Sequence, residues 1–187
     1  MTALNLAGRV VSIDGALSAV AHAFGGALAL AYYAEPRATI DIDVNVFVPP
    51  DQLDQVLGPL VGLGVDDGGA QTAALIRRDG QARLWWEATP VDLFFAYDPF
   101  HLAAAKACRS VPFATTTIPI LGPEHLMVCK AVFDRAKDWV DIESMLEAGD
   151  PVDEEEVLAW VARIAGLDDP RYRRLVRLLH GGGRQRT

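Results

Sequence analysis

The sequence predicts an α/β fold of the α+β kind: a mixed, twisted β-sheet core with flanking helices, and a C-terminal helical segment. Short stretches of alternating apolar residues recur as far as residue 121, and helical apolar spacing separates several of them. After residue 121 only the helical spacing continues. The chain of 187 residues is 51% hydrophobic, which allows a sizeable core. We therefore expect residues 1–121 to form the sheet-containing core and residues 122–187 to form helices packed on it.

The first part of the chain reads as helix, strand, helix, strand and helix in turn. The expected elements are a helix at 4–19, a strand at 21–24 ending in Gly25-Gly26, a helix at 27–34, a strand at 40–48, and a helix at 51–63. Proline at position 36 stops the second helix, because proline restricts the residue before it. The strand at 40–48 has the clearest pattern, since an apolar residue occupies every second position from Ile40 to Val48.

A hairpin, a further strand and a series of helices follow. Asp79-Gly80 is typical of a two-residue turn, so we expect strands at 72–78 and 81–86 on either side of it. The remaining predictions are a strand at 90–97, a helix at 100–108, extended chain at 111–121, helices at 123–135, 137–147, 153–164 and 170–179, and an unstructured tail at 181–187. Pro123 and Pro170 suit the first turn of a helix.

The charge and the cysteine content argue against two classes of protein, those that bind nucleic acids non-specifically and those stabilised by disulfides. The net charge of −8 and the isoelectric point near 4.9 argue against non-specific binding to a nucleic acid backbone, which needs clustered Lys and Arg. The basic helix at 171–177 could still contact RNA locally, although a solvated face is the simpler interpretation. Two cysteines suggest no disulfide framework. We see neither a signal peptide nor a run of apolar residues long enough to span a membrane, and expect a cytoplasmic protein with no membrane partner.

Two aspartates stand two residues apart in the strand at 40–48. Side chains at that spacing share one face of a strand, so Asp41 and Asp43 would repel each other unless a cation lies between them. Mg²⁺ is commonly held by one or two carboxylates together with phosphate oxygens. A third acid, Asp92, interrupts an apolar strand, where a lone buried carboxylate is costly. If the two strands are neighbours, the three acids could hold metal ions for phosphoryl or nucleotidyl transfer. Two acids on a solvated strand face remain the alternative.

The stretch AFGGALALAYYAEPRATIDIDVNVF resembles the signature of the DNA polymerase β-like nucleotidyltransferase superfamily. That signature is a Gly-Gly or Gly-Ser pair, a helix, and Asp-x-Asp between apolar residues. The run Arg37-Ala38-Thr39 is similar to the bacterial group of minimal nucleotidyltransferases and AbiEii-like abortive-infection toxins. The later stretch ILGPEHLMVCKAVFDRAKDWVDIESML is similar to that group's segment with a helical lysine followed by Arg-x-Lys-Asp-x-x-Asp. The resemblance extends over about residues 23–146.

The resemblance implies a role for each matching residue. Asp41 and Asp43 would hold the Mg²⁺ (or Mn²⁺) ions that bind a nucleoside triphosphate, and Asp92 would bind the catalytic metal and act as general base. Gly25 and Gly26 would cradle the triphosphate. The further nucleotide-binding candidates are Arg37, Thr39, Lys130, Arg135, Lys137 and Asp138. For Lys130 the alternative is a solvated helix residue. For Arg135 and Asp138, together with Asp141, it is a surface ion network of little energetic value.

The expected function is transfer of a nucleoside monophosphate from a nucleoside triphosphate to a hydroxyl-bearing acceptor. The acceptor could be tRNA, a protein or a small molecule, and the resemblance suggests the toxin of a toxin–antitoxin pair with an antitoxin partner. Many active members of the superfamily carry serine where this chain has Gly26. A nucleotidyltransferase-like binding or regulatory module without turnover is therefore the alternative, and a purely structural sheet protein is a second one. Trp85-Trp86 could stack on a base, although one of the pair is expected in the core.

Overall fold

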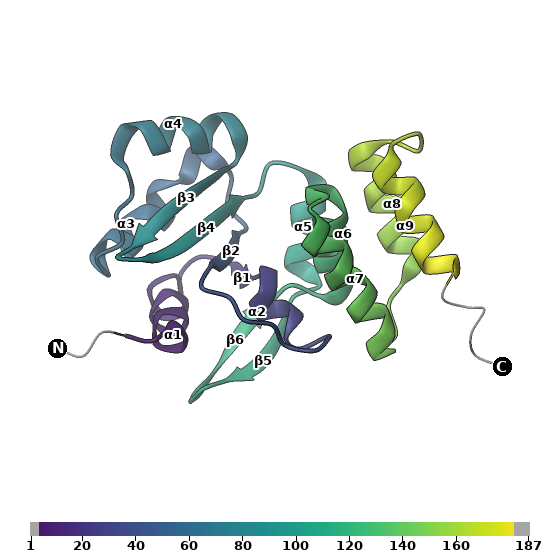
Figure 1. The fold of residues 1–187 in the computed structure, drawn as a ribbon. Helices are drawn as coiled ribbons and strands as arrows, with labels where there is room; N and C mark the ends of the chain where they lie inside the picture. The colour runs from purple at the N-terminus through teal and green to yellow at the C-terminus, as the bar shows by residue number, and fades with distance from the viewer. Residues whose placement is uncertain (1–3, 182–187) are drawn as a thin grey trace. The chain divides into compact units, whose positions relative to one another are not determined.

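A computed structural model describes residues 4–181 of the chain (Figure 1). Within these residues the chain forms two compact units. The first contains the described residues up to Leu28 together with Ala38–Leu121, and the second contains Ala29–Arg37 together with the described residues from Gly122 onward. The expected division was a single cut after residue 121. The structure also groups residues 29–37 with the later helices, because the side chain of Arg37 binds a buried carboxylate there.

The first unit contains a six-stranded mixed sheet in the order β3-β4-β2-β1-β6-β5. The strands are β1 (His22–Phe24), β2 (Ile42–Val46), β3 (Gln81–Trp86), β4 (Thr89–Phe95), β5 (Arg109–Phe113) and β6 (Thr116–Ile120). Strand β2 runs parallel to β4, and β1 runs parallel to β6. The other neighbouring pairs are antiparallel. The predicted mixed sheet with flanking helices is therefore confirmed.

One face of the central strands forms the core of this unit. Ile42, Val44 and Val46 of β2 are buried, as the alternating pattern predicts. Their partners on β4 are also buried, and the register pairs Ile42 with Val91. Ile40 was expected on the same face, but it lies before β2 begins and its side chain is exposed. The strand is shorter than predicted at both ends.

Four helices and a short 3₁₀ turn complete the first unit. They are α1 (Leu6–Ala16), η1 (Pro50–Gln52), α3 (Asp54–Gly62), α4 (Gly69–Asp79) and α5 (Pro99–Lys106). In Figure 1, α4 runs along the hairpin of β3 and β4. Helix α1 buries Val10 and Ile13, and α3 buries Val56 and Leu60. Asp98 caps α5 by accepting a hydrogen bond from the backbone amide of Phe100 at 2.9 Å.

The predicted strand at 72–78 is wrong, because this segment is helix α4. Thr72 and Ile76 lie four residues apart, as on one face of a helix, and both are buried. Gly80 does not turn a hairpin. It ends the helix in the left-handed conformation, at φ 69°, and its amide donates to the carbonyl of Ile76 at 2.8 Å. An Asp-Gly pair is found both in hairpin turns and at helix ends. Here the burial of Thr72 and Ile76 on one helical face favours the helix.

The helix predicted at 27–34 is also shorter in the structure. Helix α2 covers Gly26–Leu30 only. The backbone then continues through turns in which the amides of Tyr32 and Tyr33 donate to the carbonyls three residues earlier, at 3.1 and 2.8 Å. Tyr33 is buried, so packing of its ring accompanies the change from helix to turn.

The second unit is helical after residue 121, as predicted. Its helices are α6 (Pro123–Phe133), α7 (Ala136–Ala148), α8 (Glu154–Ala165) and α9 (Pro170–Gly181), and α8 and α9 lie side by side in Figure 1. Trp139 and Ile142 of α7 are fully buried, as are Val161 of α8 and Leu175 of α9. Residues 182–187 of the predicted tail lie outside the described residues. No helix within residues 4–181 has the length and apolar character needed to cross a membrane.

Candidate active site

The register of the sheet places two of the predicted acids directly opposite each other. Asp43 of β2 pairs with Asp92 of β4, and Asp92 pairs in turn with Arg83 of β3. On the other side of β2, the amide of Gly25 donates to the carbonyl of Asp43 at 2.9 Å. Directly paired residues present their side chains on the same face of a sheet. Asp43, Asp92 and Arg83 therefore form one row across three strands, with Gly25 at its end.

Asp41 belongs to the same face, because it precedes Asp43 by two residues. It stands just before β2, and the hydroxyl of Thr39 accepts a hydrogen bond from its backbone amide at 3.1 Å. The carboxylate of Asp41 lies 3.9 Å from the guanidinium of Arg83. The side chain of Asp41 is 30% exposed and that of Asp92 is 17% exposed. The three acids thus share one partly solvated face, opposite the apolar core.

A basic residue that the sequence patterns did not single out partly compensates the negative charge of this face. Arg83 donates from Nε and from its second terminal nitrogen to the two carboxylate oxygens of Asp92, both at 2.7 Å. The hydrogen bond with Asp92 raises the pKa of Arg83, and the nearby Asp41 and Asp43 add to that increase. The hairpin register could have revealed this contact. The loop of Glu87 and Ala88 between β3 and β4 fixes which β3 residue faces Asp92.

Gly26 lies against the carboxylate of Asp43. Its φ is +54°, which L-residues with a side chain rarely adopt. A Cβ atom at this position would stand 1.8 Å from Oδ2 of Asp43 and 2.5 Å from its Cγ. The side-chain amide of Asn45 crowds Gly25 in the same way, at 2.8 Å from a Cβ built there. A serine does not fit at position 26 unless Asp43 moves.

Neighbouring groups already contact the backbone of both glycines. The amide of Gly25 already donates to the carbonyl of Asp43 in the sheet, so it is not a donor for a phosphate. The absence of side chains at Gly25 and Gly26 lets the Asp43 carboxylate and the Asn45 amide approach the backbone closely.

The chemistry of the three acids suits a hard divalent cation, since all of the candidate ligands are carboxylate oxygens. As the side chains stand, however, no three acid, histidine or cysteine side chains within residues 4–181 are gathered around one point. Arg83 accounts for this at Asp92, because it binds both oxygens of that carboxylate. Asp41, Asp43 and Asp92 would hold Mg²⁺ once Arg83 releases Asp92.

Apart from Thr39, which lies in the first unit beside Asp41, the other predicted nucleotide-binding residues belong to the second unit. Lys130 of α6 is buried and donates to Oδ2 of Asp141 at 2.6 Å. Arg37 donates to both oxygens of Asp141, at 2.9 and 3.0 Å. Burial raises the pKa of Asp141, but the hydrogen bonds from Arg37 and Lys130 outweigh it, and the pKa lies below its ordinary value. The sequence suggests a surface ion network as the alternative for Asp141. In the structure Asp141 is buried, and its carboxylate binds both Arg37 and Lys130.

Arg135 and Asp138 form a separate pair at the start of α7. Asp138 is fully buried, and its carboxylate accepts from the side chain of Arg135 at 2.6 and 3.0 Å and from its backbone amide at 3.2 Å. This is a capping arrangement for the first turn of the helix. Lys137, the remaining candidate, is exposed on α7. The structure therefore gives Arg135 and Asp138 a helix-capping role.

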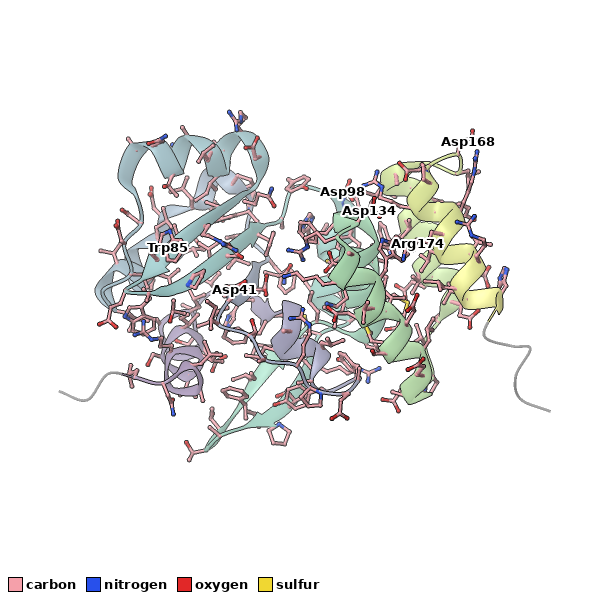
Figure 2. The ribbon with its side chains drawn as sticks, viewed as in Figure 1. Asp41, Trp85, Asp98, Asp134, Asp168 and Arg174 are labelled. Atoms are coloured by element: carbon pink, nitrogen blue, oxygen red, sulfur yellow. The ribbon has the colours of Figure 1, made fainter. Side chains whose placement is uncertain are left out.

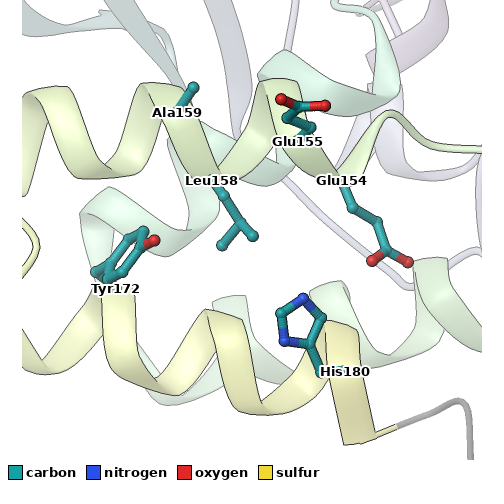
Figure 3. Close-up of a pocket in the computed structure, with 6 residues that line it drawn as sticks. All are labelled: Glu154, Glu155, Leu158, Ala159, Tyr172 and His180. Carbon is teal, nitrogen blue, oxygen red and sulfur yellow. The ribbon is translucent and has the colours of Figure 1, made fainter.

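A groove of about 490 Å³ lies between α8 and α9 in the second unit (Figure 3). It is lined by Glu154, Glu155, Leu158, Ala159, Tyr172 and His180. None of the predicted site residues contributes to it.

Known proteins resemble this chain in fold and only weakly in sequence. No model of a known protein family matches the chain, and no curated protein sequence matches it. The solution structure of the antibiotic-resistance factor ANT(2'')-Ia is similar over 95% of this chain and 96% of that chain, with a TM-score of 0.58 and 15% identity. The crystal structure of an antigenic nucleotidyltransferase-like protein from Paracoccidioides brasiliensis aligns over 92% and 91% of the two chains, with a TM-score of 0.45 and 15% identity. The chain thus shares a mixed α/β fold with that antibiotic-resistance factor.

Proposed function

We propose that the chain is a metal-dependent nucleotidyltransferase that moves a nucleoside monophosphate from a nucleoside triphosphate to a hydroxyl acceptor. One observation carries the proposal: Asp43 and Asp92 are direct partners on neighbouring strands, with Asp41 on the same face. Neighbouring carboxylates on a partly solvated face repel one another, and a bound cation relieves this repulsion. The similarity of fold to ANT(2'')-Ia agrees with this function.

The reaction replaces one phosphorus–oxygen bond by another. The acceptor oxygen forms a bond to the α-phosphorus, the bond from that phosphorus to the bridging oxygen breaks, and pyrophosphate leaves with the electron pair. Asp92 takes the proton of the acceptor hydroxyl as general base. The triphosphate would bind next to Asp43 and the backbone of Gly26, which are in close contact. Mg²⁺ or Mn²⁺ held by Asp41, Asp43 and Asp92 would neutralise the charge on the phosphates.

Two further questions are the identity of the acceptor and the biological role of the reaction. The resemblance to AbiEii-like toxins supports modification of tRNA or protein by a toxin that an antitoxin protein controls. The similarity to an antibiotic-resistance factor supports a small-molecule acceptor instead. The acidic character of the chain favours the small molecule, because a polyanionic acceptor is repelled by a net charge of −8.

A binding module without turnover is the second candidate, and the pairing of Arg83 with Asp92 favours it. Both oxygens of the general base are held by a guanidinium, and Gly26 has no hydroxyl to donate to a phosphate. If the protein is such a binding module, the ion pair between Arg83 and Asp92 stays closed and the nucleotide binds without reacting.

The test is incubation of the protein with each of the four α-labelled nucleoside triphosphates, Mg²⁺ or Mn²⁺, and cell extract. We compare the wild type with Asp43→Asn and with Asp168→Asn, a fully exposed position outside the first unit (Figure 2). Labelled product should form with the wild type and Asp168→Asn and fall at least about 100-fold with Asp43→Asn. A nucleotide-dependent rise in melting temperature without labelled product would instead establish the binding module. Neither effect with any nucleotide would refute both functions.

A further inference from the structure

A histidine is buried where the first turns of α6 and α8 meet. His125 belongs to the first turn of α6, and its side chain is only 1% exposed. Its Nε2 atom lies 3.7 Å from Oε1 of Glu156, in the first turn of α8. This distance exceeds that of a hydrogen bond, so the contact becomes an ion pair only when the imidazole is protonated. The side chain of Glu156 is 38% exposed, so water reaches the carboxylate but not the ring.

A second contact joins the same two helix ends. Oε1 of Glu124, the residue before His125, accepts a hydrogen bond from the backbone amide of Asp153 at 3.2 Å. Asp153 caps α8, because its side chain accepts from the amide of Glu156 at 2.9 Å. We call this region, formed by Glu124, His125, Asp153 and Glu156, the α6–α8 junction. The start of α8 is therefore fixed next to the buried ring, and a change in the charge of the ring acts on this junction.

Burial and two carboxylates set the charge of the imidazole. Burial lowers the pKa of His125, and the negative charges of Glu156 and Glu124 oppose this decrease without cancelling it. Protonation places a cation where water has no access, which disfavours the closed junction. The stability that the neutral ring contributes is therefore complete above the ordinary pKa of about 6.5. It falls at lower pH, until the buried ring itself takes up a proton.

The other helices that pack on α6 bring their charges to a different part of it. Asp141 of α7 binds Lys130, and Arg171 of α9 donates to the carbonyl of Val132 at 2.9 Å. Lys130 and Val132 lie further along α6 than His125, by about 7–11 Å at the helical rise per residue. Titration of His125 therefore acts on the start of α8 more than on the contacts of α7.

We propose that His125 is a pH-sensitive contact between α6 and α8, and that mild acid releases the start of α8 from α6. Histidine is the side chain that ordinarily titrates between pH 5 and 8. A ring that stays neutral in the closed junction, but has the ordinary pKa of about 6.5 once α8 opens, makes opening about tenfold easier at pH 5.5 than at pH 7.5. Attraction to Glu156 lets the closed junction hold some charged ring, which reduces this effect.

The test is amide hydrogen exchange of the full chain at pH 5.5 and pH 7.5, with the rates corrected for the intrinsic pH dependence of exchange. In the wild type, protection of the α8 amides should fall by about threefold to tenfold on acidification, and protection of the α7 amides should fall less. NMR titration of the His125 ring, assigned by its absence in His125→Gln, should give a midpoint below about pH 6.5.

Three variants assign the effect to this contact. His125→Gln carries an uncharged amide, so protection of α8 should change less than about twofold between the two pH values. Glu156→Gln removes a charge that favours the protonated ring, so the loss of protection should approach the tenfold limit and the midpoint of the ring should decrease. His101→Gln is the matched control, because burial also lowers the pKa of His101, which lies on α5 in the first unit. It should keep the wild-type pH dependence of α8.

Several results would overturn the inference. They are α8 protection that does not change with pH in the wild type, an equal loss in His125→Gln, or a ring midpoint at or above about pH 6.5. If His125→Gln does not fold, Glu156→Gln decides, because an unchanged loss of protection in that variant rejects the contact. These measurements need neither nucleotide nor turnover, so failure of the proposed function leaves this inference intact.

Discussion

Gly26 and Asp43 are in close contact, and this contact sets what residue 26 can be. The positive φ of Gly26 and the nearness of the carboxylate both exclude a side chain. Gly26 is therefore matched to the position of Asp43. A side chain at residue 26 would displace the Asp43 carboxylate.

We predict that Gly26→Ala moves the Asp43 carboxylate and impairs Mn²⁺ binding at least tenfold. The left-handed backbone adds a cost of about 1–2 kcal/mol to the free energy of folding. Calorimetric Mn²⁺ titration and urea unfolding measure the two effects. Gly15→Ala in α1 is the matched control, because a Cβ there meets nothing within 4 Å. It should leave Mn²⁺ binding unchanged and stabilise the protein slightly. Wild-type Mn²⁺ affinity in Gly26→Ala would contradict the proposed importance of this contact.

Arg83 and a divalent cation compete for the same carboxylates. The guanidinium binds Asp92 on two oxygens and lies near Asp41, so it supplies the positive charge that a metal would otherwise supply. Metal binding requires this ion pair to open. The partly exposed pair contributes about 1 kcal/mol or less to stability, which a bound divalent cation can replace.

Arg83→Gln should therefore bind Mn²⁺ several-fold more tightly than the wild type. Without metal its stability should fall, because three carboxylates lose their counter-charge, and Mn²⁺ should restore it. Melting temperature as a function of Mn²⁺ concentration shows both effects. Arg78→Gln removes a similar two-oxygen pair with Asp79 on α4, and serves as the control. Equal or weaker Mn²⁺ affinity in Arg83→Gln would show that the guanidinium does not compete with metal.

Helices α6 and α7 and the segment before β2 are joined by a single carboxylate. Asp141 accepts from Lys130 of α6 and from Arg37, and it is almost fully buried. The side chain of Arg37 is partly exposed to water, whereas that of Lys130 is almost fully buried. Lys130 thus serves the packing of the second unit.

We predict that Asp141→Asn destabilises the protein by about 3–5 kcal/mol, because it leaves the Lys130 ammonium buried without its counter-ion. Lys130→Met, of similar shape, should cost less. The pKa of Asp141 is lowered in the folded state, so its contribution is complete above the unfolded carboxyl pKa of about 4 and is lost as pH falls through the lowered value. Urea unfolding between pH 3 and 7 should show the gap between wild type and Asp141→Asn narrowing below about pH 4. A constant gap over this range would contradict the pKa assignment.

The distribution of charge limits the partners of the protein. The chain carries a net charge of −8, and the basic helix α9 is partly neutralised by neighbouring acids. Arg171 pairs with Asp169 at 2.9 Å, and Arg173 pairs with Asp168 at 3.0 Å. The arginine-rich segment that suggested RNA contact therefore presents less positive charge than its sequence implies.

We expect no retention of the protein on immobilised heparin at a salt concentration of about 100 mM, because nothing compensates the repulsion between polyanions. Asp168→Asn combined with Asp169→Asn frees both arginines and should increase retention measurably. Strong retention of the wild type would show that α9 binds polyanions despite the neighbouring acids, and would favour a nucleic acid acceptor.

Local sequence patterns predicted the secondary structure of some segments correctly and that of others wrongly. The strand of Asp43, the helices after residue 121 and the first-turn position of Pro123 were predicted correctly, because apolar periodicity and proline geometry act over a few residues. The segment 72–78 was predicted wrongly. Its Asp-Gly ending suits both a hairpin and a helix end, and only burial of Thr72 and Ile76 distinguishes the two.

The amino-acid pattern alone was enough to establish a mixed sheet followed by helices and to indicate Asp41, Asp43 and Asp92 as the acids of interest. Folding in three dimensions decided which residues face those acids. The pairing of Arg83 with Asp92, the burial of His125 near Glu156, and the burial of Asp141 between Lys130 and Arg37 depend on strand register and helix packing. Those contacts join residues far apart in the chain, and their energies arise only when the backbone brings the partners within a few ångströms of each other.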